Sequence, residues 1–91
     1  MKYTIKPGSI AAVQYVERAL PSGADNQRWT AVYMAEGKQP EITDAAGRHA
    51  TLPMPVLAAI NRNFGMMFSI PVERRQALIN ATVPQTVDIE E

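Results

Sequence analysis

Proline residues divide the second half of the chain into two short segments, and this division limits the possible folds more than any other feature. Pro53 and Pro55 end a preceding strand and suit the first turn of a helix, whereas Pro71 makes the chain start a new element. The segments that follow these prolines have helical propensities. We therefore expect helices at residues 56–68 and 72–80, which together form an αα hairpin.

The apolar residues of the first expected helix recur at the spacing of one helical face. An amphipathic helix buries this face against another element, and a sheet built from the first half of the chain can receive it. The apolar face consists of Val56, Leu57, Ile60 and Phe64, followed by Met67 or Phe68.

Two segments of the first half favour β-strands. Residues 3–5 are β-prone and are followed by Pro7 and Gly8, so we expect a short edge strand there. Residues 29–34 are rich in aromatic and β-branched residues, which is typical of a strand. Because both faces of this segment are largely apolar, we expect a central strand with helices on one side and another surface on the other.

Residues 10–20 fit two structures. Ser9 can cap a helix in this segment, where apolar residues recur at helical spacing. The segment also fits a strand, because apolar and polar residues alternate around Gln14 and because Val16 is β-branched. We expect the helix, with the strand as the alternative.

Residues 41–52 predict a β-hairpin with short polar arms. Asp44 can begin its turn through the side chain, and Gly47 can adopt the positive φ that closes it. The whole pattern predicts an α+β fold with a small antiparallel sheet of three to four strands and the αα hairpin on one face. We expect one compact domain at residues 1–83 and an acidic, flexible tail at residues 84–91, with addition of residues 87–91 as a strand at a sheet edge as the alternative.

The charge and composition of the chain limit its partners. Nine basic residues balance nine acidic ones, so the formal net charge is zero and long-range attraction to nucleic acid or an anionic membrane is weak. The chain has no cysteine, and no segment has the roughly 18 consecutive apolar residues of a membrane span. We expect a cytoplasmic protein without a membrane partner.

Catalytic residue patterns are weak in this sequence. His49 is the one histidine, so neither a triad nor a metal site has a second imidazole or a cysteine to use. The serines occur in capping or turn contexts, and the acidic residues are scattered along the chain. We therefore expect no enzyme activity, no cofactor and no metal site.

The segment GMMFSIPVERR, at residues 65–75, suggests where a partner binds. One interpretation is that its large apolar residues pin the two helices together inside the fold. The other is that they form an exposed, adaptable apolar patch with arginines at its edge, as protein-binding surfaces do. The expected partner-binding residues are Met66, Met67, Arg62, Arg74 and Arg75.

These observations predict a small, non-catalytic protein-binding module. Its expected role, by analogy with other compact accessory proteins, is that of an inhibitor or adaptor of a bacterial or phage macromolecular machine. The partner is then a host protein or a second copy, and the apolar second face of the central strand predicts a homodimer. The alternative is a nucleic-acid-binding dimer in which the two C-terminal helices act as a helix-turn-helix.

Overall fold

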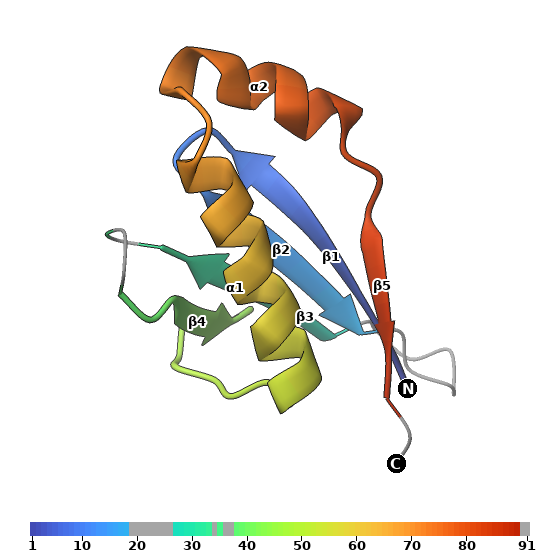
Figure 1. Cartoon of the computed structure of the whole chain (residues 1–91). Helices are drawn as coiled ribbons and strands as arrows, with labels where there is room; N and C mark the ends of the chain where they lie inside the picture. Colours follow the sequence, from blue (N-terminus) through green and yellow to red (C-terminus); the bar gives the residue numbers. More distant parts are fainter. Residues whose placement is uncertain (19–26, 34, 36–37, 90–91) are drawn as a thin grey trace.

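The computed structural model of the chain describes residues 1–18, 27–33, 35 and 38–89 (Figure 1). The five strands form one antiparallel sheet in the order β4-β3-β2-β1-β5, which confirms the α+β class but exceeds the three to four strands expected. The elements in chain order are β1 (Lys2–Ser9), β2 (Val13–Arg18), β3 (Gln27–Val32), β4 (Glu41–Asp44), α1 (Met54–Phe68), α2 (Val72–Ala81) and β5 (Gln85–Asp88).

The expected helix at residues 10–20 is wrong, and the alternative strand is correct for the part that β2 occupies. Gln14 and Val16 are buried while Tyr15 between them is exposed, as the two-residue period of a strand requires. A tight turn joins β1 to β2, in which the Ala12 amide donates to the Ser9 carbonyl at 3.1 Å. Ala12 adopts a left-handed φ of 61° there. Because β1 and β3 both pair with β2, strand pairing satisfies its backbone groups on both sides.

β1 is longer and more central than the sequence predicts. It runs through Pro7 and Gly8, and it lies between β2 and β5 rather than at the edge of the sheet. The register with β2 shifts between Pro7 and Ser9, so the proline falls at an irregularity of the ladder. Proline is tolerated at such positions because the regular backbone pairing is already interrupted.

The last described residues form an edge strand where the sequence predicts a flexible tail. β5 pairs antiparallel with β1, with Val87 opposite Tyr3, and the Ile89 amide donates to the Met1 carbonyl at 2.9 Å. The β-prone pair Thr86 and Val87 supplies partners for the outer backbone groups of β1. Residues 90–91 lie outside the described part of the chain.

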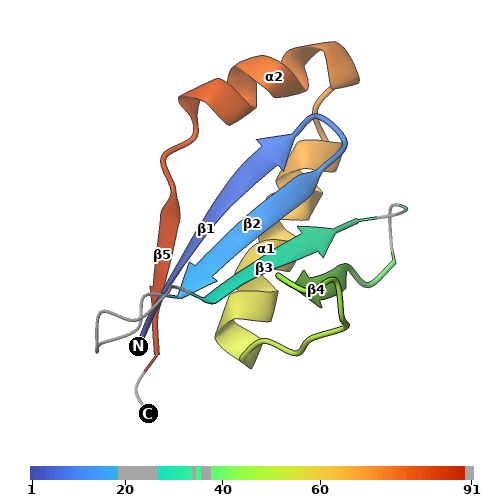
Figure 2. The same cartoon turned by 180° about the vertical axis from the view of Figure 1, so that it is seen from behind.

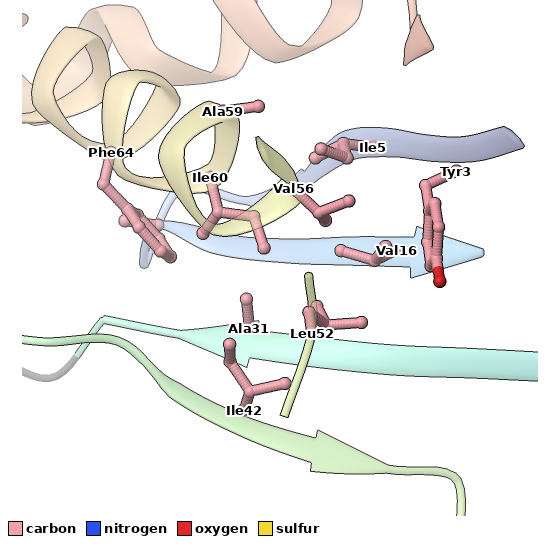
Figure 3. Close-up of a cluster of buried hydrophobic side chains, with 11 residues drawn as sticks. Tyr3, Ile5, Val16, Ala31, Ile42, Leu52, Val56, Ala59, Ile60 and Phe64 are labelled. Atoms are coloured by element: carbon pink, nitrogen blue, oxygen red, sulfur yellow. The ribbon is translucent and has the colours of Figure 1, made fainter. Parts of the chain in front are cut away.

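The core lies between α1 and one face of the sheet. Figure 3 shows α1 side chains, among them Ile60 and Phe64, pointing toward the strands, with Leu52 beside them. The helical face expected from the sequence is buried at Val56, Ile60 and Phe64. Tyr33 follows β3 and packs on Phe64 with the ring centroids 4.6 Å apart.

The expected packing of both helices on the sheet as a hairpin is not confirmed. α1 covers the sheet, whereas α2 crosses beyond the end of β1, near the turn to β2, in both views (Figures 1 and 2). None of the ten residues of α2 is buried. Pro71, at the N-cap of α2, has an extended conformation, which redirects the chain between the helices.

The turn expected after residue 43 is confirmed in its details. The Asp44 carboxylate accepts hydrogen bonds from the amides of Ala46 and Arg48 at 2.9 and 3.0 Å, and Gly47 has a φ of 80°. The second arm is shorter than expected, because it pairs with β4 only through the bridge between Thr43 and His49.

α1 leaves the opposite face of the sheet uncovered (Figure 2). The residues in register on this face are mainly polar, which corrects the expectation of two apolar faces on β3. Lys6, Tyr15, Thr30 and Thr43 are in register across β1 to β4 on this face. An open groove of about 800 Å³ lies on this face. The expected apolar character depended partly on Met34, which lies outside the described residues.

Candidate partner-binding groove

A small apolar groove lies where α1 ends, between α2, β1 and the connection to β5. Its volume is about 90 Å³. Apolar side chains from four separate segments meet there because α2 crosses beyond the end of β1 and the chain then returns along the sheet to form β5 (Figure 1). The groove is lined by Ile5, Pro7, Asn63, Met66, Met67, Leu78, Thr82, Val83 and Gln85.

The structure places the two expected methionines differently. Met67 is only 3% exposed, whereas Met66 is an exposed large apolar residue at 59%. Successive residues on an α-helix point about 100° apart, so one side chain reaches the sheet side while its neighbour projects from the surface. Met67 therefore forms the buried base of the groove, and Met66 stands at its opening.

Val83 is the second exposed apolar residue at the groove, and the sequence reasoning missed it. Its side chain is 80% exposed in the connection between α2 and β5. The sequence did offer a signal for it. Val83 is an apolar residue between Thr82 and Pro84, where it belongs to neither the interior of a helix nor that of a strand. Together, Met66 and Val83 give the opening an apolar rim.

The structure gives Arg75 a packing role. Its Nε donates to the Ile70 carbonyl at 3.1 Å, and its Nη1 donates to the Ile10 carbonyl at 3.3 Å. The guanidinium carbon lies 5.2 Å from the ring centroid of Phe68, which is within the range of a cation–π contact. Arg75 therefore joins α2 to the helix connection and to the turn between β1 and β2.

The other two expected arginines are exposed and do not line the groove. Arg62 is on α1 and Arg74 is on α2, and neither guanidinium makes a hydrogen bond or an ion pair with the described part of the chain. Phe68, by contrast, packs against Tyr33 at a centroid distance of 4.9 Å, which agrees with the interpretation that it faces inward. The groove therefore brings together Met66 and Met67 but neither of these arginines.

A polar pair, the buried Gln14 and the half-buried Asn63, holds the end of α1 near the groove to the sheet. Gln14, which is 1% exposed, donates to the Ile60 carbonyl at 3.0 Å and accepts a hydrogen bond from Asn63 at 3.1 Å. Buried amides need such partners because an unsatisfied polar group in the core costs about 1–3 kcal/mol. This pair fixes the position of Asn63, which lines the groove.

The titratable groups of the described residues do not gather into a reactive cluster. His49 is largely exposed, and its Nε2 lies 3.5 Å from a carboxylate oxygen of Glu41. Within residues 1–18, 27–33, 35 and 38–89, no three acidic or histidine side chains are close enough to hold a metal ion. Neither described helix is long and apolar enough to cross a membrane.

Comparisons of the chain with protein-family models, curated proteins and solved structures find no match.

Proposed function

We propose that this chain is a non-catalytic module that binds another protein through the groove rimmed by Met66 and Val83. The observation that supports this most directly is the exposure of both side chains, 59% and 80%, at the opening of an apolar groove. Large apolar side chains that are exposed beside a concave apolar surface are typical of protein-binding sites. Methionine suits such a site because its unbranched, flexible side chain adapts to different partner surfaces.

The role that we propose for this binding is inhibition or adaptation of a bacterial or phage macromolecular machine in the cytoplasm. A small module of this kind acts by occupying a surface of its partner, and it needs no catalytic group to do so. Zero net charge supports a protein partner rather than a polyanion, since affinity for nucleic acid depends strongly on neutralised phosphates.

The test is affinity capture from a nuclease-treated bacterial lysate, with the purified protein as bait and mass spectrometry as readout. The double variant Met66→Ser, Val83→Ser should fold and lose the captured protein. The matched control Met54→Ser, Val72→Ser removes the same two side-chain types at positions that are 75% and 53% exposed but outside the groove. The proposal predicts that wild type and control retain the captured protein, and retention by the groove variant would refute it.

A second candidate function is nucleic-acid binding by α1 and α2. The observation in its favour is that only residues 69–71 separate these helices, which is the length of a helix-turn-helix connection. Arg62 and Arg74 are the exposed cations available on the helices, because Arg75 already contacts Ile10, Ile70 and Phe68. Recovery of nucleic acid in an untreated eluate, and its loss with an Arg62→Ala, Arg74→Ala variant, would favour this function.

A further inference from the structure

α2 is weakly attached to the rest of the fold. None of its ten residues is buried, and Leu78 and Ile79 are half-buried. An isolated helix of this length is marginal in water, because helices shorter than about 12–15 residues do not repay the cost of nucleation. The position of α2 therefore depends on a few contacts with neighbouring segments.

Arg75 provides the polar part of this attachment. Among the described residues, it is the one side chain of α2 that donates hydrogen bonds to carbonyls outside the helix, those of Ile70 and Ile10. The side chain of Gln76 donates to Asn80 within the same helix, and the Oγ1 of Thr82, just after the helix, donates to the Leu78 carbonyl at 2.6 Å. The guanidinium of Arg75 also lies over the ring of Phe68, which adds a contact with the end of α1.

The opposite half of α2 borders the groove. Leu78 lines it together with Ile5 and Met67, which are buried at 0% and 3% exposure. The connections on both sides of α2 each contain a proline, Pro71 and Pro84, so the chain is non-helical at both ends of this element. Changes at these two short connections can move α2 while the sheet and α1 keep their pairing and packing.

We propose that α2 is a hinged cover over the groove, held closed by Arg75, and that its opening exposes the apolar surface of Ile5 and Met67. Any effect of this opening on partner binding rests on the proposed function, because the opening would enlarge the groove that is proposed to bind the partner. The contacts of Arg75 that hold α2 in this position are with the carbonyls of Ile70 and Ile10 and with the ring of Phe68.

Native-state hydrogen exchange of the unmodified protein tests the hinged cover. The amides of residues 76–81 in α2 should exchange by an opening with little dependence on denaturant, at least about tenfold faster than the core amides of α1. Exchange of α1 and α2 by one common, strongly denaturant-dependent opening would overturn the proposal. No partner is needed for this measurement, so its outcome is independent of whether the groove binds a protein.

The variant Arg75→Ala tests the role of the arginine, with Arg74→Ala as its matched control on the same helix. Arg75→Ala should speed exchange in α2 by a further factor of about ten, with α1 still protected, and it should raise the fluorescence of the apolar dye anilinonaphthalene sulfonate. Arg74→Ala should leave both readouts unchanged. Equal effects of the two variants, or global unfolding of Arg75→Ala, would overturn the assignment of Arg75.

If α2 opens as proposed but the groove variant Met66→Ser, Val83→Ser keeps its captured protein, the binding function fails and the hinged cover stands. If capture depends on the groove while α2 exchanges together with α1, the hinged cover fails and the binding function stands.

Discussion

Gly8 lies under the ring of Tyr15 on the polar face of the sheet, and this contact explains why β1 has a glycine there. A Cβ built at Gly8 would overlap the ring of Tyr15. Aromatic side chains that cover a glycine on a neighbouring strand are a known way to stabilise sheets. The exposed Tyr15 therefore has a structural role in addition to any contact with a partner.

We predict that Gly8→Ala destabilises the protein by about 1 kcal/mol or more, because the methyl group displaces the Tyr15 ring. The measurement is the free energy of unfolding in urea. Gly65→Ala is the control, since a Cβ at Gly65 in α1 meets no atom within 4 Å. That change should stabilise the protein by roughly 0.5–1 kcal/mol, the usual gain over glycine inside a helix. A Gly8→Ala variant as stable as wild type would contradict the prediction.

Residue-level roles at the groove were only partly predictable from the sequence. The segment at residues 65–75 was identified as a candidate contact region, and Met66 is exposed as that interpretation requires. The sequence could not show that Met67 is buried, because either of two adjacent helical positions could face the sheet. It also could not show that Arg75 reaches Ile10, a residue 65 positions away in the chain.

At the scale of elements, the helices were easier to predict than the strands. The prolines and the apolar spacing set α1 and α2 nearly to the residue, because helical hydrogen bonds are local. β2 and β5 were misassigned, because a strand depends on partners that are distant in sequence. Val16 is consistent with a helix or a strand until β1 and β3 pair on its two sides.

β5 should contribute measurably to stability, in contrast to a flexible tail. Deletion of residues 85–91 removes Val87 and Ile89, both packed against the core, and leaves the outer edge of β1 unpaired. We predict a loss of at least about 1 kcal/mol, which corresponds to a decrease in Tm of about 4–8 °C for a domain of this size. Calorimetry or circular dichroism measures it, and an unchanged Tm would show that β5 adds nothing to the fold.

A pair of point variants tests which side of β5 packs against the core. Val87→Ala should account for about 1 kcal/mol of the loss, because it removes apolar surface that packs against the core. Thr86→Ala, at the neighbouring exposed position, should cost only a few tenths of a kcal/mol. Equal effects at both positions would contradict the observed orientation of the strand.

At the scale of the whole molecule, α1 leaves the opposite face of the sheet uncovered (Figure 2). This face has charges of both signs, with Lys6 on β1 and an ion pair of 3.2 Å between Arg28 and Glu17 on the next two strands. A two-fold axis through such a face brings the same patch of two copies together, so that each cation can approach an acidic group of the other copy. We therefore expect a dimer to form by charge pairing on this face, in place of the apolar contact that the sequence suggests.

We therefore predict a homodimer at micromolar concentration, assembled through this polar face. Light scattering should give twice the chain mass of 10.0 kDa. Lys6→Glu should shift the protein to a single chain, because it makes the face predominantly acidic in both copies and like charges then oppose each other. Lys38→Glu makes the same charge change at an exposed position outside the strands, and it should leave the dimer intact. A monomeric mass for wild type across this range would refute the dimer. Equal behaviour of the two variants would refute this interface, because Lys6 lies on the polar face and Lys38 lies outside the strands.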